Sequence, residues 1–258
     1  MNRICIVTLW LTAFVLCMIS ACGYQKSDQE KITIATAANM NYAMKELSAV
    51  FTQKTGIKCD LVVSSSGKLT AQIIEGAPYD VFVSADMKYP NEIFRVGLTQ
   101  HPPKIYAYGE LVLWTMKEGI TPSMASLTKD SIEHIAVANP KTAPYGHAAI
   151  AALNNFRIFD AVSHKLVYGE SISQTNQFII SRAADLGFTA MSVVLSPEMK
   201  GKGRWVALND KYYPPIPQGV VAIERKKSNR KHTQQFYDFL FSAEAKQLLK
   251  KFGYSVDE

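Results

Sequence analysis

The sequence lacks the motifs by which nucleotide-binding proteins and hydrolases are usually recognised. It contains no GxxxxGK[ST], no GxGxxG and no GxSxG pattern. Its five histidines are never three or four residues apart, which excludes a helical metal site of the HExxH kind. No acid–base pair or nucleophile–base arrangement typical of an enzyme is recognisable either, so no motif supports an enzyme.

Cysteine and excess charge are also scarce. Four cysteines in 258 residues are too few for a fold built on disulfides. The 28 basic and 22 acidic side chains give a net charge of +6, and much of the excess lies in residues 225–231 (RKKSNRK). Such a short run is typical of a solvated turn, so we expect no nucleic-acid partner. The 48% of hydrophobic residues fits a globular chain, whose length suits two domains of roughly 100–130 residues.

The first segment is typical of a secretion signal. A positive start, Met1 to Arg3, precedes residues 4–19, which are apolar apart from two threonines. This stretch is shorter than the about 20 residues that a transmembrane helix needs. It ends in Ile19-Ser20-Ala21-Cys22, which resembles the lipobox of bacterial lipoproteins. The resemblance implies a signal peptide at 1–21, a lipid on Cys22 and a polar tether at 22–30; cleavage at a nearby site without lipidation is the alternative.

Cleavage changes the opening counts. Removing residues 1–21 takes away Arg3 and no acidic residue, which leaves a net charge of +5. It also removes two cysteines, and lipidation would block Cys22. Cys59 is then the single thiol of the fold, where we expect it to be a small buried apolar side chain that forms no disulfide.

From residue 31 onward, short β-rich runs alternate with helical patterns. Strands are predicted at residues 32–35, 57–63, 79–83, 105–116, 135–138, 165–168, 187–190, 205–208 and 219–223, and helices at 40–51, 69–75, 92–96, 146–156, 173–184, 231–241 and 243–252. Asn39 is expected to cap the first helix and Gly56 to end it. The alternation predicts an α/β fold of two units, joined by extended crossings near 106–110 and 214–219.

Four strand-to-helix junctions carry small or polar residues instead of charged ones. They are residues 37–39 (AAN), 64–67 (SSSG), 143–146 (APYG) and 171–173 (SIS). The start of a helix exposes unpaired N–H groups and the positive end of the helix dipole, which together suit an anion. Junctions from two facing units could therefore surround an oxyanion with hydrogen bonds, although taken singly each could be an ordinary cap.

The combined motifs resemble the periplasmic molybdate-binding proteins of ABC transporters. The matching stretches are residues 32–44 (ITIATAANMNYAM), 64–73 (SSSGKLTAQI), 79–86 (YDVFVSAD), 139–146 (NPKTAPYG), 185–190 (DLGFTA) and 252–254 (FGY). The resemblance spans residues 31–254. It implies the type II periplasmic binding protein fold, with two lobes, mixed sheets flanked by helices and two crossover strands. It also implies that molybdate or tungstate is the ligand.

Carried over residue by residue, the resemblance implies an oxyanion site made by Asn39, Ser66, Tyr145 and the N–H of Ile172. Molybdenum would be held as the oxyanion, with no metal directly coordinated and no cofactor. A tyrosine that some members carry in the last site strand is replaced here by Ala190, and Tyr145 is expected to supply a phenol instead.

The resulting prediction is a solute-binding protein and not an enzyme. Residues 31–107 and 216–258 are expected to form the first lobe and 108–215 the second. The protein would act as a monomer on the periplasmic or cell-surface side, held to a membrane by its lipid alone, and would pass its ligand to an ABC permease with its ATPase subunit. The alternatives are another tetrahedral oxyanion such as sulfate, an envelope enzyme acting on an anionic substrate, and iron bound by Tyr212 and Tyr213.

The lipid anchor has a direct test. Replacing Cys22 by serine removes the thiol that carries the acyl groups, so we expect the Cys22→Ser protein to be released from membranes with its ligand binding intact. Membrane fractionation followed by a binding assay measures both. A Cys22→Ser protein that still sediments with membranes contradicts the lipobox.

Overall fold

The computed structural model describes residues 31–99, 101–225 and 229–257. The predicted signal peptide (1–21) and the tether (22–30) with Cys22 lie outside the described residues, as does part of the basic run (226–228). In the described part of the chain, no helix combines the length and the apolar character that spanning a membrane requires.

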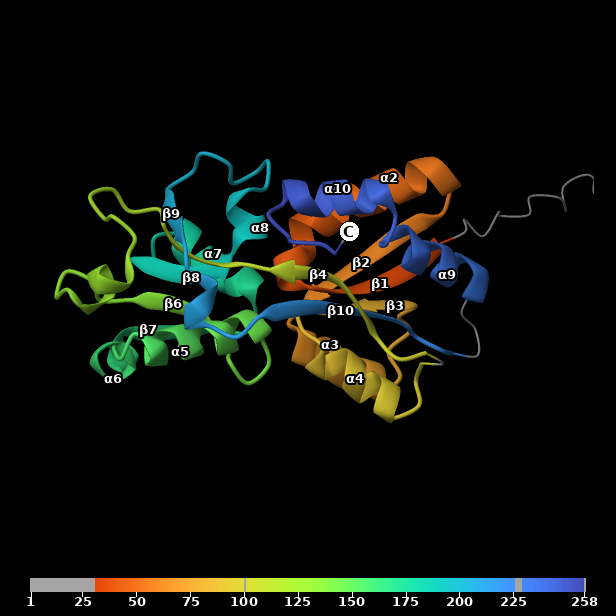
Figure 1. Cartoon of the computed structure of the whole chain (residues 1–258), viewed down its shortest axis with the longest axis horizontal. Helices are drawn as coiled ribbons and strands as arrows, with labels where there is room; N and C mark the ends of the chain where they lie inside the picture. The colour runs from red at the N-terminus through yellow and green to blue at the C-terminus, as the bar shows by residue number, and fades with distance from the viewer. Residues whose placement is uncertain (1–30, 100, 226–228, 258) are drawn as a thin grey trace, which may run out of the picture. The chain divides into compact units, whose positions relative to one another are not determined.

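The strands form two five-stranded mixed sheets (Figure 1). Sheet A has the spatial order β2 (Lys58–Ser64), β1 (Lys31–Ala37), β3 (Val81–Val83), β10 (Ile216–Ala222) and β4 (Lys104–Gly109). Sheet B has the order β7 (Leu166–Gly169), β6 (Ile135–Ala138), β8 (Leu186–Ala190), β5 (Leu111–Thr115) and β9 (Arg204–Ala207). The first three strands of each are parallel, and the fourth runs antiparallel to the third.

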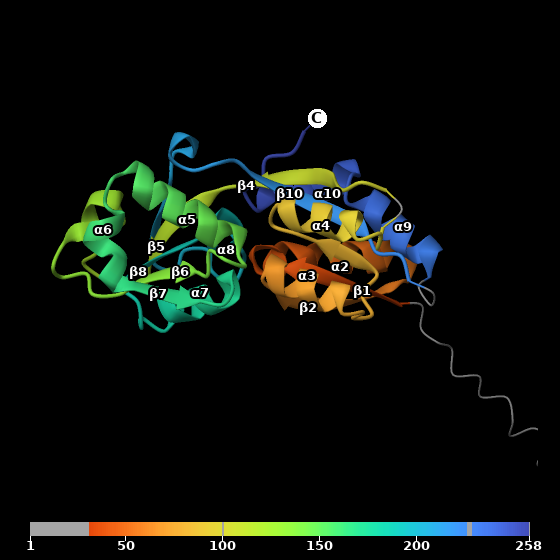
Figure 2. The same ribbon diagram turned by 90° about the horizontal axis from the view of Figure 1, so that it is seen from below.

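Helices accompany each sheet, and a sheet with its helices is called a lobe below. Lobe 1 contains sheet A with η1 (Ala38–Met40), α2 (Asn41–Thr55), α3 (Ser66–Ile74), α4 (Lys88–Arg95), α9 (Arg230–Phe239) and α10 (Ala243–Lys251). Lobe 2 contains sheet B with η2 (Met124–Thr128), α5 (Pro144–Asn155), α6 (Phe159–Val162), η3 (Ser163–Lys165), α7 (Ile172–Ile180), α8 (Met191–Val194) and η4 (Asp210–Tyr212). Figure 2 shows α3 and α4 side by side on lobe 1, opposite the face that α2 and α10 cover in Figure 1.

The central strands of sheet A are buried on both faces and are largely apolar, whereas its edge strand β2 is partly exposed and carries Lys58 and Asp60. Ile32 and Ile34 of β1 belong to the core under α2, α9 and α10, whereas Ala35 belongs to the core under α3 and α4. Helix α2 buries residues at three- and four-residue spacing, from Ala43 to Phe51. It ends at Gly56, whose φ of 75° is in the left-handed region, as the sequence predicts.

The chain passes between the sheets twice. The β-rich run at 105–116 proves to be two strands, because β4 ends in sheet A at Gly109 and β5 begins in sheet B at Leu111. The second passage leads from β9 through η4 to β10. The C-terminal helices then return to lobe 1, where α10 packs on α2 and α9 on β10. The lobe boundaries at 107/108 and 215/216 stay a prediction.

The two sheets share one internal order, so their strands correspond in pairs. By position, β1 corresponds to β6, β2 to β7 and β3 to β8. The segments that follow them correspond as well: η1 follows β1 as α5 follows β6, and α3 follows β2 as α7 follows β7. Each lobe therefore presents two helix starts at the carboxyl ends of adjacent parallel strands.

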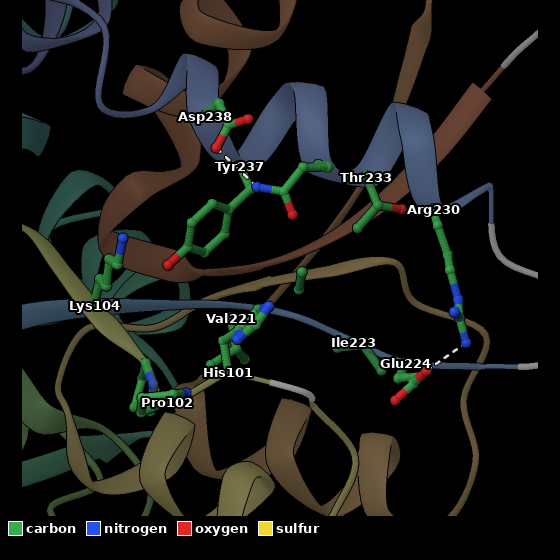
Figure 3. A pocket seen from close by; sticks show the side chains of 13 residues that line it. His101, Pro102, Lys104, Val221, Ile223, Glu224, Arg230, Thr233, Tyr237 and Asp238 are labelled. Atoms are coloured by element: carbon green, nitrogen blue, oxygen red, sulfur yellow. Dashed lines mark hydrogen bonds and ion pairs between the residues drawn. The ribbon is translucent and has the colours of Figure 1, made fainter.

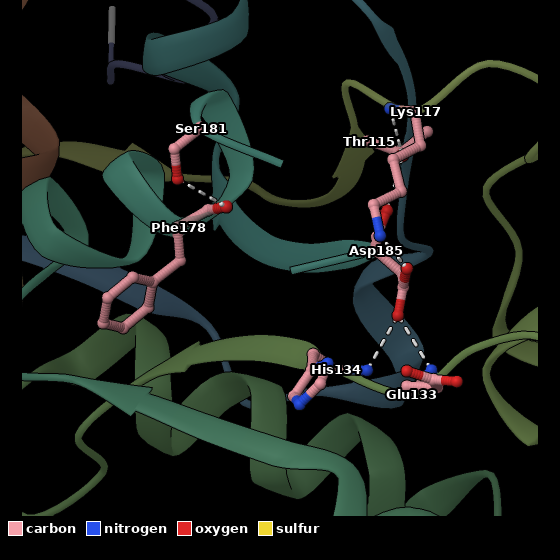
Figure 4. A network of polar contacts seen from close by, with 7 residues as sticks. All are labelled: Thr115, Lys117, Glu133, His134, Phe178, Ser181 and Asp185. Atoms are coloured by element: carbon pink, nitrogen blue, oxygen red, sulfur yellow. Dashed lines mark hydrogen bonds and ion pairs between the residues drawn. The ribbon is translucent and has the colours of Figure 1, made fainter. Parts of the chain in front are cut away.

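Asp185 lies just before β8, at the amino end of the strand, and forms hydrogen bonds and an ion pair there (Figure 4). The Asp185 carboxylate accepts the backbone N–H groups of Glu133 and His134, both at 2.8 Å, and forms an ion pair with Lys117. Burial works to raise the pKa of Asp185, but the Lys117 ammonium and the two N–H groups outweigh it and bring the pKa below its usual value. Asp80 stands before β3 in the same way, accepting the Thr33 N–H at 2.8 Å.

Replacing Asp185 by asparagine should destabilise the fold without touching the carboxyl ends of the strands. We expect Asp185→Asn to lower the free energy of unfolding by about 1–3 kcal/mol at pH 7. The substitution removes the negative charge of a buried carboxylate that binds two N–H groups and the Lys117 ammonium. The folded pKa lies below the unfolded value of about 3.9, so this stability is present above that pH and is lost as the pH falls through the folded pKa.

Urea unfolding at pH 7 and at a series of acidic pH values measures the effect. Asp60→Asn is the control, because the ion pair of Asp60 with Lys31 is exposed. An Asp185→Asn effect no larger than that of Asp60→Asn, or one that stays constant down to pH 2, contradicts this account.

Candidate anion-binding site

The four predicted junctions meet at one small cavity between the lobes. Residues from the ends of β1, β2 and β3 and from the starts of η1, α3, α5 and α7 line it. They are Ala37, Ala38, Asn39, Ser65, Ser66, Ala85, Ala143, Pro144, Tyr145 and Ile172. The structure thus brings together all four residues that the sequence singles out, although 133 positions separate the first from the last.

The cavity is neutral and rich in hydrogen-bond donors. None of the described residues that line it carries a charged side chain. Asn39, Ser66, Tyr145 and Ile172 each lie in the first turn of a helix, where N–H groups have no partner within the helix. The volume of about 10 Å³ accommodates about one water molecule, so a tetrahedral oxyanion fits only if the walls move apart.

Ser66 begins α3 and lines this cavity. The residue is fully buried, and its Oγ accepts the Ala85 N–H at 3.0 Å. That bond fixes the oxygen, while no acceptor among the described residues takes the hydroxyl proton. A buried hydroxyl whose lone pair is used and whose proton is unused is suited to donate to an oxyanion.

Tyr145 lines the cavity from lobe 2. Its ring is 1% exposed, and its Oη has no hydrogen-bond partner among the described residues. Burial, reinforced by the phenols of Tyr254, Tyr106 and Tyr213, raises the pKa of Tyr145 well above its usual value, so the hydroxyl keeps its proton. Gly109 makes room for it, because a Cβ at that position would lie 2.0 Å from the Tyr145 oxygen.

The expectation that Asn39 caps a helix is wrong. Its Nδ2 donates to Gln218 Oε1 at 2.8 Å and to Tyr254 Oη at 2.9 Å, and it caps nothing. The reason is the short turn η1, which lies between β1 and α2. Asn39 is inside this turn, so it does not occupy the N-cap position of α2, and its side chain is buried in the protein interior. Both amide protons of Asn39 are therefore used inside the protein, and its backbone N–H has no partner within the turn.

Ile172 begins α7 and faces the cavity from lobe 2, where its N–H is the group available. Ala190 is buried at the end of β8 and does not line the cavity. Lys68, the nearest cation in the sequence to Ser66, forms an ion pair with Glu170 in the loop before α7. This pair joins the lobes at the rim, and the lysine side chain stays 42% exposed.

Two other sequence hypotheses find no support in the described residues. Tyr213 has a structural contact instead, because its Oη accepts the Leu111 N–H at 3.2 Å, and the Tyr212 ring packs against Phe156. No group of three or more His, Cys, Asp or Glu side chains that could hold a metal occurs in the described ranges. Cys59 is partly buried, and burial raises the pKa of its thiol to about 11, which makes it a poor nucleophile.

A larger cavity lies elsewhere in lobe 1 (Figure 3). It measures about 560 Å³ and is lined by α9, by the end of β10 and by residues 101–104. Charged side chains surround it, including Lys104, Asp238 and the ion pair of Arg230 with Glu224. None of the residues predicted to bind an anion lies there, so size alone does not identify the site.

Three features of the site were not apparent from the sequence. Gln218, Tyr254 and Ser192 surround Asn39 with hydrogen bonds from distant parts of the chain. Gln218 could have been noticed in the sequence, because it is a polar residue inside the apolar strand β10. Nothing in the sequence pointed to Ser192, since α8 was not predicted as a helix.

Removing single donors tests the site. We expect Ser66→Ala to weaken the binding of the oxyanion about 5- to 150-fold, because a charge-assisted hydrogen bond in a buried cavity contributes about 1–3 kcal/mol. Asn39→Ala should weaken it over the same range by releasing η1. Titration calorimetry measures both, with Ser84→Ala as the control, a buried serine of lobe 1 that does not line the cavity. Unchanged affinity in both variants would move the site elsewhere.

Comparison with known proteins agrees with this geometry. Residues 32–255 match the family described as bacterial extracellular solute-binding protein. The chain is 35% identical over 228 residues to the molybdate-binding protein ModA of Rhodobacter capsulatus, covering 88% of this chain and 89% of that protein. It is 27% identical over 255 residues to YvgL of Bacillus subtilis, a putative ABC transporter substrate-binding lipoprotein, covering 96% of each.

Among solved structures, the periplasmic molybdate-binding protein of Azotobacter vinelandii superposes with a TM-score of 0.83 at 31% identity, covering 88% of this chain and all of that one. The predicted type II periplasmic binding protein fold is thereby confirmed, and so is the prediction of a binding protein in place of an enzyme. The chain belongs to the family of bacterial extracellular solute-binding proteins.

Proposed function

We propose that this protein captures molybdate between its two lobes and delivers it to an ABC permease with its ATPase subunit. The observation that carries this proposal is the neutral cavity at which four helix starts meet, two from each lobe. A relative that shares 35% of its residues over most of the chain is a molybdate-binding protein, which supports molybdate as the ligand.

The oxyanion would be held by donors alone. We assign it to Ser66 Oγ, Tyr145 Oη and the N–H groups of Asn39 and Ile172, with the metal reached only through its oxygens. Charge-assisted hydrogen bonds contribute about 1.5–3 kcal/mol each, so several together offset the dehydration of a dianion without a lysine or an arginine. Tungstate has the same charge and shape, so it should bind as well.

Binding requires the lobes to separate and close again. The cavity of about 10 Å³ cannot admit a tetrahedral oxyanion from solvent while the helix starts of both lobes face each other. The two chain passages, at Glu110 and before β10, are the covalent links about which lobe 1 (31–107 and 216–258) and lobe 2 (108–215) would turn. The anion would then supply the attraction that holds the closed form.

We further propose that the protein acts outside the cytoplasmic membrane as a monomer, with residues 1–21 removed, Cys22 lipidated and residues 22–30 as a tether. The relative YvgL of Bacillus subtilis, whose name includes the word lipoprotein, supports this arrangement. Attachment through the lipid would keep the binding unit beside the permease that it serves.

Sulfate is the competing ligand. It is a tetrahedral dianion without a proton, and a cavity lined only by neutral donors would accept its charge and its geometry as readily as those of molybdate. The two anions differ in size. Discrimination between them must therefore come from the distances between the four helix starts in the closed form of the protein.

Calorimetric titration of the Cys22→Ser protein without its signal peptide decides between these ligands. We expect heat and saturable binding with molybdate and tungstate, and at least a hundredfold weaker binding of sulfate and phosphate. Binding of sulfate as tight as that of molybdate would assign the protein to sulfate. No binding of molybdate or tungstate would contradict the proposed function.

A further inference from the structure

Directly behind the cavity, four buried polar side chains form one hydrogen-bond network. They are Asn39, Gln218, Tyr254 and Ser192, which are between 0 and 3% exposed. The network contains no charged group and lies beyond the reach of solvent. Asn39 Oδ1 has no hydrogen-bond partner among the described residues, whereas every other side-chain polar atom of these four residues has one inside the protein. Such a network strongly determines the positions of its members.

The direction of each hydrogen bond follows from Gln218. Its Nε2 donates to the carbonyls of Ala85 (3.1 Å) and Ile216 (3.0 Å), so its Oε1 is left as the acceptor for Asn39. Asn39 must therefore present Nδ2, whose second proton goes to Tyr254 Oη at 2.9 Å. The Tyr254 proton then points to Ser192 Oγ at 3.0 Å or to the Asn39 carbonyl at 3.2 Å.

Ser192 closes this network from the other lobe. It lies in α8 of lobe 2, whereas Asn39, Gln218 and Tyr254 belong to lobe 1. Its hydroxyl donates to the Asn39 carbonyl at 2.7 Å. The Asn39 carbonyl therefore receives a hydroxyl proton from lobe 2 in addition to its contact with Tyr254 of lobe 1.

This bond differs from the other direct links between the lobes. Between lobe 1 and the loop before α5, the Gly67 N–H donates to the Thr142 carbonyl at 2.9 Å and Tyr89 Oη donates to the Lys141 carbonyl at 3.0 Å. Lys68 and Glu170 add an exposed ion pair. None of these residues lines the cavity, whereas Asn39, the acceptor for Ser192, does.

We propose that Ser192 is a positioning residue, which acts through the Asn39 carbonyl to couple closure of the lobes to the anion site. When the lobes close, the Asn39 carbonyl is buried, and the Ser192 hydroxyl replaces the water that it loses. The same bond holds the turn η1, whose N–H groups face the cavity. In the open form Ser192 is out of reach, so its contribution exists only in the closed, ligand-holding form.

Another serine of the same segment provides a matched control. Ser196 is buried like Ser192, and its hydroxyl also donates to a carbonyl at 2.7 Å, but that carbonyl belongs to Val193 in the same lobe. Each substitution by alanine deletes one buried hydroxyl–carbonyl bond, and Ser192→Ala also removes the oxygen that the Tyr254 hydroxyl contacts at 3.0 Å. Only the bonds of Ser192 cross between the lobes.

The test measures molybdate affinity by calorimetry and the stability of the ligand-free protein by urea unfolding, for Ser192→Ala and Ser196→Ala in the Cys22→Ser protein. We expect Ser192→Ala to weaken molybdate binding about three- to thirtyfold, as for one lost buried hydrogen bond, with a smaller loss of ligand-free stability than Ser196→Ala. Ser196→Ala should leave the affinity within a factor of two. Ser192→Thr, which keeps a hydroxyl, should recover part of the affinity.

A second pair of variants reaches the network from lobe 1. Tyr254→Phe keeps the ring and removes the hydroxyl that binds Asn39, so it should also weaken molybdate binding. Its control is Tyr106→Phe, a buried tyrosine whose hydroxyl donates to the Ser84 carbonyl at 3.4 Å. This pair decides the question if Ser192→Ala does not fold.

The inference rests on the proposed molybdate binding, and the two fail differently. If the unsubstituted protein does not bind molybdate, the proposed function is wrong. If it binds molybdate but the Ser192 and Ser196 variants change the affinity equally, or neither changes it, the coupling role of Ser192 is overturned. Loss of affinity that accompanies an equal loss of ligand-free stability also overturns it, because the bond would then be structural.

Discussion

The unpaired N–H groups at helix starts are the constraint on which the rest of this structure depends. A dianion in a cavity without lysine or arginine can be held only by dipoles and hydrogen-bond donors that are fixed in place before it arrives. Each lobe brings two such starts together, because the carboxyl ends of adjacent parallel strands lie at one edge of a sheet. The shared strand order of the two sheets makes this arrangement occur twice, and the lobes face each other across it.

The remaining polar groups of the fold hold these donors in place. At the amino ends of the strands, Asp185 and Asp80 fasten backbone N–H groups and keep the edges of the sheets aligned. Behind the cavity, Gln218 and Tyr254 fix Asn39 through its amide. None of the described residues that line the cavity carries a charged side chain, so the cavity offers neutral donors only.

Much of this arrangement could be predicted because it is local. Apolar periodicity, Gly56 as a helix stop and the small residues at four junctions are all visible along the sequence, and every predicted strand and helix overlaps an observed one. Long-range side-chain pairing is not visible in this way. The Asn39 amide was expected to cap its own helix, but it bonds to Gln218 and Tyr254, 179 and 215 positions away. The assignment of Asn39, Ser66, Tyr145 and Ile172 to one anion site follows from the family resemblance and not from any local pattern.

The measurement that tests this account most directly is a crystal structure of the protein with molybdate. The account predicts a closed form in which the oxyanion lies at the cavity where η1, α3, α5 and α7 begin, with oxygens accepting from Ser66 Oγ and from N–H groups of both lobes. An anion bound by residues of a single lobe, or one held beside Lys104 and Arg230 in the larger cavity of Figure 3, would contradict it.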